Sequence, residues 1–174
     1  MKKFLLSLTV AVASVFSSSA ETFEVTFTNK NAGWPKTSSY TDVHTSTDEF
    51  GGSQWSYKGM SNNSQGWDYV RVGAKSQKDG ADAYIYSTSP IEYAVDAVSV
   101  NVVNFLRDKI NSATLLIADD DKFTNPKSIN FTGNLTTTGE LIANVDNPEP
   151  NKYYKINFNY TNNISKNGVF DMDK

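Results

Sequence analysis

Apolar side chains recur at every second position through most of this sequence. The clearest runs are Tyr154, Ile156, Phe158 and Tyr160, then Val98, Val100 and Val102, then Phe23, Val25 and Phe27. Such alternation places apolar side chains on one face of a β-strand. Turn residues divide the chain into about ten such segments, at the spacing typical of sandwiches and barrels. Because these strands must cover their apolar faces, the sequence predicts an all-β, antiparallel sandwich of two sheets and about ten strands.

Individual segments refine this expectation. The alternating residues Glu21–Asn29 predict a half-buried first strand, and the Ser- and Thr-rich Tyr40–Phe50 predicts an exposed or edge strand. Val95–Val103 is β-branched almost throughout and predicts a central strand. The one helical candidate is Asn104–Asn111, one or two turns long. The last predicted strand, Gly168–Asp173, ends next to Lys174, so either this strand is short or the sequence is a fragment whose continuation would complete it.

The first twenty residues have the pattern of a cleavable export signal. Lys2 and Lys3 precede a largely apolar stretch, Phe4–Phe16, and small residues precede the expected cleavage after Ala20. This stretch is shorter than the ~20 apolar residues that a membrane-spanning helix needs. We therefore expect a signal peptide over residues 1–20, a single β-sandwich domain over residues 21–174, no membrane insertion, and a secreted or cell-surface location.

The composition excludes several classes of function. The chain has no cysteine, which excludes disulfides, cysteine nucleophiles, thiolate metal sites and lipid attachment to an N-terminal cysteine. An exported chain without disulfides fits a bacterial source. The 16 Lys and Arg residues are outnumbered by 19 Asp and Glu, and cleavage of the leader would remove two of the basic residues. This acidic balance argues against nucleic acid as a partner.

Residues suited to catalysis are few. His44 is the only histidine, it lies in a predicted exposed strand, and the chain has no G-x-S-x-G motif to place a serine nucleophile. A surface histidine is therefore the favoured interpretation. The glutamates that could pair for glycoside hydrolysis lie on or near strands, outside any recognisable motif. We therefore expect no enzymatic activity.

No cofactor is expected, with structural calcium as the open alternative. Calcium takes hard oxygen ligands, which the acidic run Asp119–Asp121 offers, although this run also fits a solvated hairpin tip, the favoured interpretation. A second candidate site joins the two ends of the domain through Glu24 with Asp171 or Asp173. Alternation turns these side chains outward, which favours exposed charges at a sheet edge instead.

Aromatic residues give the main indication of a ligand. All three tryptophans lie between Trp34 and Trp67, with several tyrosines beside them, and sugar rings pack their C–H faces on aromatic planes. A core position is the favoured interpretation for Trp55, because large aromatics dominate sandwich cores. Trp34 and Trp67 each follow a loop glycine and suit either role. The polar residues that could bind sugar hydroxyls beside them are Asn62, Asn63 and Asp68.

Several segments together carry a resemblance to a known family. They are Trp55, Tyr69–Gly73, Ser87, Pro90–Ile91, Val95–Val103, Tyr153–Ile156 and Asn167–Gly168. With them, most of the chain after the leader resembles the jelly-roll-like, galactose-binding-like β-sandwich domains of exported proteins from gut bacteria, which are similar to carbohydrate-binding modules. The resemblance implies a sandwich with a non-catalytic role, and it assigns no ligand-binding residue.

These observations predict an exported, non-catalytic β-sandwich that binds a polysaccharide or other glycan at or outside the cell surface. The predicted site consists of Trp34, Trp67, Asn62, Asn63 and Asp68. The alternatives are a structural or adhesive surface domain with no small-molecule ligand and, less favoured, a glycoside-processing enzyme. Fold alone does not choose among these functions. Burial of both Trp34 and Trp67 would contradict the stacking hypothesis.

Overall fold

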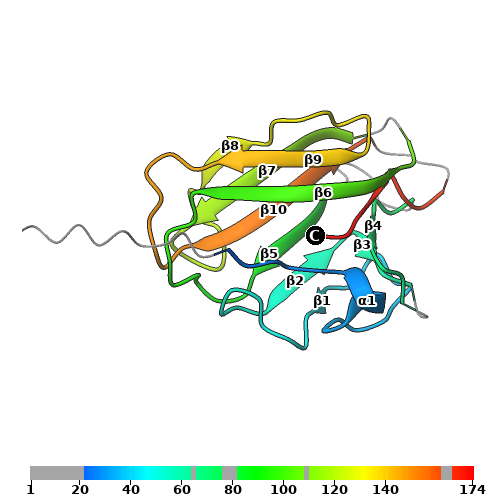
Figure 1. The fold of residues 1–174 in the computed structure, drawn as a ribbon, viewed down its shortest axis with the longest axis horizontal. Coiled ribbons are helices and arrows are strands. Elements are labelled where there is room, and N and C mark those ends of the chain that lie inside the picture. The colour runs from blue at the N-terminus through cyan, green and yellow to red at the C-terminus, as the bar shows by residue number, and fades with distance from the viewer. Residues whose placement is uncertain (1–21, 64–65, 76–81, 108–109, 162–165) are drawn as a thin grey trace, which may run out of the picture.

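Two antiparallel sheets packed face to face form the protein (Figure 1). The computed structural model describes residues 22–63, 66–75, 82–107, 110–161 and 166–174, so the predicted leader lies outside the described residues. The six-stranded sheet has the order β1 (His44–Thr45), β2 (Trp55–Lys58), β5 (Asp82–Ser87), β10 (Tyr153–Tyr160), β7 (Ile110–Ala118) and β8 (Lys127–Asn130). The five-stranded sheet has the order β3 (Met60–Ser61), β4 (Val70–Val72), β11 (Phe170–Met172), β6 (Ala97–Phe105) and β9 (Gly139–Asn144). The predicted all-β, two-sheet sandwich is confirmed.

Alternation predicted the long strands well. Buried and half-buried residues alternate without exception along β10, which pairs with β5 on one side and β7 on the other. The segment predicted to be a central strand forms β6, which lies between β11 and β9. The segment predicted to be an exposed or edge strand contributes only His44 and Thr45, as β1 at the edge of the six-stranded sheet.

The chain passes from one sheet to the other at Gly59. β2 belongs to the six-stranded sheet and β3 to the five-stranded sheet, yet only this glycine separates them. Gly59 has a φ of +75°, and a Cβ at this position would lie 2.8 Å from the Cα of Ala83. A side chain would therefore be strained by the backbone conformation and would collide with β5. The corner brings the aromatic residues of β2 into the core.

The core lies between the two sheets and is rich in aromatic rings. Phe158 of β10 and Phe170 of β11 meet edge to face across the sandwich, with ring centroids 5.1 Å apart. Tyr57 of β2 is fully buried and packs against Trp34, at 5.0 Å between centroids, and against Phe27 at 6.2 Å. Edge-to-face and tilted pairs of this kind stabilise a core beyond their buried area. Trp55 is 5 % exposed, which confirms its predicted core position.

Two local predictions were wrong. The segment expected to form a first strand has no strand among its described residues, although its alternation is visible in burial, from the half-buried Phe23 and Val25 to the buried Phe27. The helix expected over Asn104–Asn111 is replaced by the end of β6 and the start of β7, where the chain crosses between the sheets. The only helical element among the described residues is a single turn, α1 (Thr28–Asn31), which includes residues with positive φ. Within the described part of the chain, no helix has the length and apolar character to cross a membrane.

Candidate binding site on the five-stranded sheet

Trp34, a predicted sugar-stacking residue, lies in the core. Its side chain is 5 % exposed, and its indole Nε1 donates a hydrogen bond to the backbone oxygen of Thr26 at 3.1 Å. Its ring packs on Phe27 at 4.9 Å and lies nearly parallel to Phe50 at 6.1 Å. Because these contacts bury the ring, Trp34 offers no aromatic face to a ligand, and its predicted role in stacking is wrong.

Asn62 is also an interior residue with a structural role. It is 0 % exposed, its Oδ1 accepts the backbone N–H of Thr37 at 2.8 Å, and its Nδ2 donates to the backbone oxygen of Pro35 at 2.9 Å. Its backbone oxygen accepts the N–H of Trp67 at 2.9 Å. Asn62 thus holds two loops together, and its side chain is closed to solvent and therefore to a sugar hydroxyl.

Trp67, Tyr69 and Arg71 form a cluster on the outer face of the five-stranded sheet, here called the Trp67 cluster. The rings of Trp67 and Tyr69 are stacked, with centroids 5.0 Å apart and an interplanar angle of 27°. The guanidinium carbon of Arg71 lies 4.6 Å from the centroid of the Trp67 ring and 5.7 Å from that of Tyr69. A guanidinium at this distance is attracted to the aromatic face, so the three side chains hold one another in place. All three are half-buried.

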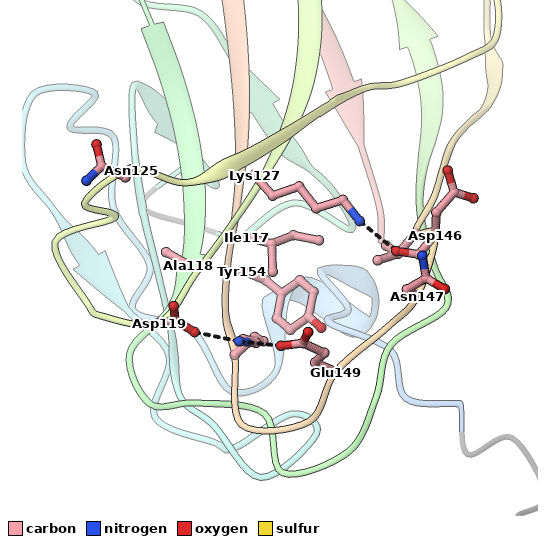
Figure 2. A pocket seen from close by; sticks show the side chains of 11 residues that line it. Ile117, Ala118, Asp119, Asn125, Lys127, Asp146, Asn147, Glu149 and Tyr154 are labelled. Carbon is pink, nitrogen blue, oxygen red and sulfur yellow. Dashed lines mark hydrogen bonds and ion pairs between the residues drawn. The ribbon is translucent and has the colours of Figure 1, made fainter.

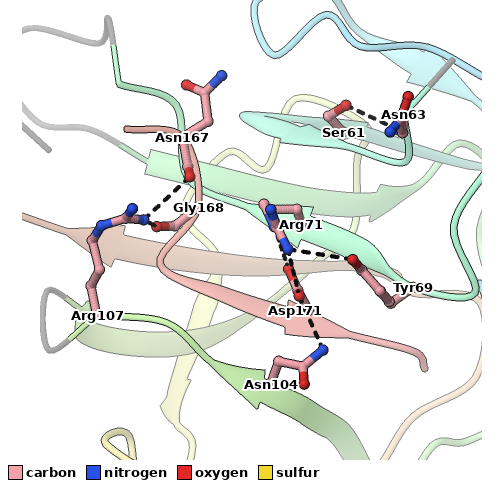
Figure 3. Close-up of polar contacts among 9 residues, drawn as sticks. All are labelled: Ser61, Asn63, Tyr69, Arg71, Asn104, Arg107, Asn167, Gly168 and Asp171. Carbon is pink, nitrogen blue, oxygen red and sulfur yellow. Dashed lines mark hydrogen bonds and ion pairs between the residues drawn. The ribbon is translucent and has the colours of Figure 1, made fainter. Parts of the chain in front are cut away.

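Asp171 anchors this cluster from beneath (Figure 3). Its Oδ1 accepts Arg71 Nε at 2.7 Å and its Oδ2 accepts Arg71 Nη2 at 3.0 Å, a bidentate pair, while Asn104 Nδ2 donates to the same Oδ2 at 3.1 Å. Asp171 is 0 % exposed, so the expectation of an exposed charge was wrong. The register explains the contact, because strand pairing aligns Ser61, Arg71, Asp171 and Asn104 in one row across β3, β4, β11 and β6.

Burial and charge around the row change the pKa of its titratable groups. Hydrogen bonding to the Asp171 carboxylate raises the pKa of Arg71 above its ordinary value, so the guanidinium stays charged. Burial raises the pKa of Tyr40, which lies beside the row, to about 12. Burial also raises the pKa of Tyr69. The hydroxyls near the Trp67 cluster therefore remain neutral hydrogen-bonding groups throughout the physiological pH range.

Asn63 and Asp68, the other predicted polar residues, lie in the turn that leads to the Trp67 cluster. Asn63 has a φ of +65°, its backbone oxygen accepts the N–H of Gly66 at 3.1 Å, and its own N–H donates to Ser61 Oγ at 3.2 Å. Asp68 is exposed, and its carboxylate accepts the backbone N–H of Lys30. The structure therefore brings Trp67, Asn63 and Asp68 into one turn, whereas Trp34 and the side chain of Asn62 lie in the interior.

Arg71, Asp171 and Asn104 were not among the residues predicted for the glycan site. Arg71 and Asp171 are 100 positions apart, and their pairing depends on β11 lying beside β4, which no local pattern reveals. The spacing of Trp67, Tyr69 and Arg71 did carry a signal, because residues at every second position of an extended segment share a face.

A similar but less constrained aromatic surface lies on the six-stranded sheet. Tyr84 and Tyr86 alternate along the outer face of β5, and Lys155 of β10 places its Nζ 4.1 Å from the centroid of the Tyr84 ring. Phe123 meets Tyr86 edge to face at 6.4 Å. A lysine ammonium is a flexible point charge, whereas Arg71 is fixed by a bidentate pair, so the Trp67 cluster is the better preorganised of the two surfaces.

A charged pocket of about 340 Å³ lies at the ends of β7 and β10 (Figure 2). Lys152 Nζ lies 2.5 Å from Asp119 Oδ1 and 2.7 Å from Glu149 Oε2, and Lys127 Nζ donates to the backbone oxygen of Asp146 at 2.6 Å. These two carboxylates raise the pKa of Lys152, which stays charged. One ammonium group thus contacts both of these carboxylates in the pocket.

The residues considered for metal binding or nucleophilic catalysis do not come together in one site within the described part of the chain. In the acidic run, Asp119 pairs with Lys152, and Asp120 accepts the N–H groups of Lys122 and Thr124, which lowers its pKa and fits a turn. At the ends of the domain, Glu24 pairs with Lys174 at 3.1 Å, while Asp173 accepts Asn101 Nδ2 at 2.9 Å. The described residues include no group of three or more His, Asp or Glu side chains placed to hold a metal ion. His44 is half-buried, 5.4 Å from the ring of Tyr57.

Comparison with protein-family models, with curated proteins and with solved structures gives no match to this chain. The resemblance to galactose-binding-like domains therefore stays a prediction.

Proposed function

We propose that this protein is an exported, non-catalytic β-sandwich that binds glycans through the Trp67 cluster. The observation that supports this proposal is the contact of Arg71 with both aromatic rings, fixed by the buried carboxylate of Asp171. A surface held in place before binding loses little conformational freedom when a ligand docks. The leader pattern over residues 1–20 supports export, because it is typical of a cleavable signal.

The chemistry of the cluster favours neutral glycans. The rings of Trp67 and Tyr69 suit the C–H faces of sugars, and the exposed side chains of Asn104 and Asp68 suit their hydroxyl groups. The charge of Arg71 is balanced by Asp171, and Asp68 adds a further negative charge nearby. The guanidinium of Arg71 is therefore already paired with a carboxylate and offers little charge to an anionic glycan, so we propose that neutral polysaccharides bind better than acidic ones.

A retention experiment with matched variants tests the proposal. The purified chain is passed over immobilised neutral polysaccharides, such as xylan, mannan and galactan, and over acidic ones, such as polygalacturonate. Trp67→Ala should weaken binding by about tenfold, which corresponds to about 1.4 kcal/mol. Tyr84→Ala removes an aromatic ring from the other outer face and should leave binding unchanged. Equal retention of wild type and Trp67→Ala would exclude the Trp67 cluster as the site.

A structural or adhesive domain without a small ligand is the second candidate. The bidentate pair of Arg71 and Asp171 ties β4 to β11, and the aromatic rings of the Trp67 cluster pack beside this pair. If that were their only role, Trp67→Ala would lower the free energy of unfolding while the wild-type chain showed no retention on any polysaccharide. A glycoside-processing enzyme would instead release reducing ends, and Glu149→Gln in the charged pocket would abolish that release.

A further inference from the structure

The charged pocket at the ends of β7 and β10 shares no residue with the Trp67 cluster. Residues at the ends of β7, β8 and β10 line it, together with the segment 145–149 that follows β9. Its volume of about 340 Å³ lies near the lower limit for ligand sites, about 300–1,000 Å³. A pocket of this size suits a small molecule rather than a polymer chain.

The segment after β9 is fixed at both of its ends. Val145 donates its backbone N–H to the oxygen of Asp96 at 2.7 Å. Asn151 donates its own to the oxygen of Ile91 at 2.7 Å. Two prolines between these hydrogen bonds further restrict the backbone. The pocket is therefore largely formed before a ligand binds, which lowers the conformational cost of binding.

The floor of the pocket is apolar. Ile117 of β7 and Tyr154 of β10 lie there with Val145, and all three are at most 8 % exposed. Figure 2 shows the side chains of Ile117 and Tyr154 between Lys127 on one side and Glu149 on the other. A ligand that spans the pocket therefore needs an apolar part between its polar groups.

Two carboxylates share one ammonium on one side of the pocket. Lys152 Nζ lies 2.5 Å from Asp119 Oδ1 and 2.7 Å from Glu149 Oε2. One negative charge therefore remains in excess, and a carboxylate can accept more than one hydrogen bond on each oxygen. Both carboxylates are well exposed, at 85 % for Asp119 and 67 % for Glu149, so they can also contact a cationic group of a ligand.

Lys127 provides the opposite charge on the other side. Its Nζ reaches across from β8 and donates to the backbone oxygen of Asp146 at 2.6 Å (Figure 2). No carboxylate of the described residues forms an ion pair with this ammonium, and that includes the side chain of Asp146. Because an ammonium has three donors, Lys127 can still bind an anionic group.

We propose that this pocket binds a small zwitterion of the amino-acid class, either a free amino acid or a dipeptide, with an apolar side chain. The ammonium of the ligand contacts Asp119 and Glu149, and its carboxylate bonds to Lys127. Its side chain packs on Ile117 and Tyr154. A neutral sugar would leave both charges of the pocket unmatched and would find no exposed aromatic face, because Tyr154 is 2 % exposed. The site is separate from the Trp67 cluster, so the inference does not rest on glycan binding.

A titration of the full chain followed by NMR tests this proposal. The probes are L-leucine and L-leucyl-L-leucine, each with an N-acetylated control that lacks the ammonium and a C-amidated control that lacks the carboxylate. A zwitterion should shift the backbone amide signals of Ala118 and Asn147, which line the pocket. Each of its two controls should bind at least fivefold more weakly. Tighter binding of leucine would assign the pocket to free amino acids, and tighter binding of leucyl-leucine would assign it to dipeptides.

Variants assign each charge of the ligand to its partner. Lys127→Met should weaken binding of the zwitterion about fivefold and leave binding of the C-amidated control unchanged, because that control has no carboxylate. Glu149→Gln should weaken zwitterion binding about threefold, since Asp119 remains, and leave the N-acetylated control unchanged. Lys122→Met and Asp121→Asn change exposed charges that do not line the pocket, so both should bind as the wild type does.

Two results would overturn the proposal. The first is the absence of any shift at Ala118 and Asn147 with either zwitterion at about 20 mM, a concentration that detects a Kd of about 1 mM. The second is equal binding of a zwitterion and its two controls, which would show that the charges of the pocket do not select the ligand.

Discussion

The pair between Arg71 and Asp171 offers a direct test of how the candidate site is built. Asp171→Ala removes a fully buried carboxylate that accepts two hydrogen bonds from Arg71, at 2.7 and 3.0 Å, and one from Asn104 at 3.1 Å. Removal of one partner of a buried pair costs about 3–5 kcal/mol when the remaining charge stays buried. The side chain of Arg71 is 25 % exposed, so its guanidinium can turn toward water. We therefore expect a loss near the lower limit, about 3 kcal/mol.

The measurement is urea-induced unfolding followed by tryptophan fluorescence. With an m-value of about 2 kcal/mol/M, a loss of 3 kcal/mol would lower the midpoint by about 1.5 M. Asp171→Asn keeps the shape and one acceptor but loses the charge, so it should cost less, about 2 kcal/mol. Asp171→Asn loses the charged pair that holds Arg71 in place, while the sheet stays folded. This variant should therefore also bind more weakly to any polysaccharide that binds the wild-type protein.

Asp173 provides the matched control, because it lies two residues further along, is half-buried, and its side chain accepts one hydrogen bond, from Asn101 at 2.9 Å. Asp173→Ala should cost about 1 kcal/mol. If Asp171→Ala and Asp173→Ala lowered the free energy of unfolding equally, the reasoning about the buried pair would be refuted. A loss below about 0.5 kcal/mol for Asp171→Ala would refute it as well.

Three further predictions concern the core and its corners. The hydroxyl of Tyr57 is the only buried polar side-chain atom without a hydrogen-bond partner among the described residues. Tyr57→Phe should therefore raise the free energy of unfolding, measured by urea titration, by about 1 kcal/mol. A decrease of that size would mean that the hydroxyl is hydrogen-bonded. Burial raises the pKa of Tyr40 from 10.0 to about 12, so the unfolded chain releases this proton first as pH rises. Tyr40 should thus contribute about 2 kcal/mol of stability that is present below pH 10 and lost between pH 10 and 12, and the total loss over this range should be smaller by that amount in Tyr40→Phe. Gly59→Ala should cost at least about 2 kcal/mol by thermal unfolding, because its Cβ would lie 2.8 Å from the Cα of Ala83; a neutral result would show that the corner can move.

The long strands could be predicted from the sequence because one face of each lies on the core. β10 shows this most clearly, since every second residue from Tyr154 to Tyr160 is buried between two neighbouring strands. The corner at Gly59 could not be predicted, because the sequence shows a glycine between two short apolar runs but not which sheet each run joins. The same limit applies to the crossing after Phe105, where a helix was expected and the chain passes between the sheets.

The candidate site was predicted only in part, for a related reason. Trp34 and Trp67 both follow a loop glycine, and nothing local shows that Trp34 meets Phe27 and Tyr57 in the core while Trp67 lies under Arg71. Burial of a large aromatic ring depends on contacts between distant segments. The same is true of Asp171, whose outward place in its strand predicted exposure, and which is buried because Arg71 of β4 covers it.

The N-terminal segment shows that the alternation of apolar residues predicts which side chains turn toward the core, but not whether the segment pairs as a strand. Phe23, Val25 and Phe27 turn toward the core as their spacing predicts, yet only Phe27 has a backbone hydrogen bond toward the sheet, to Asp173. In an extended segment, the N–H groups of Phe23 and Val25 are in phase with that of Phe27, but no backbone oxygen of the described residues accepts them. Amide hydrogen exchange should therefore be about tenfold or more slower at Phe27 than at Phe23 and Val25. Equal protection of the three amides would mean that the whole segment is paired as a strand, and its alternation would then have predicted the pairing as well as the face.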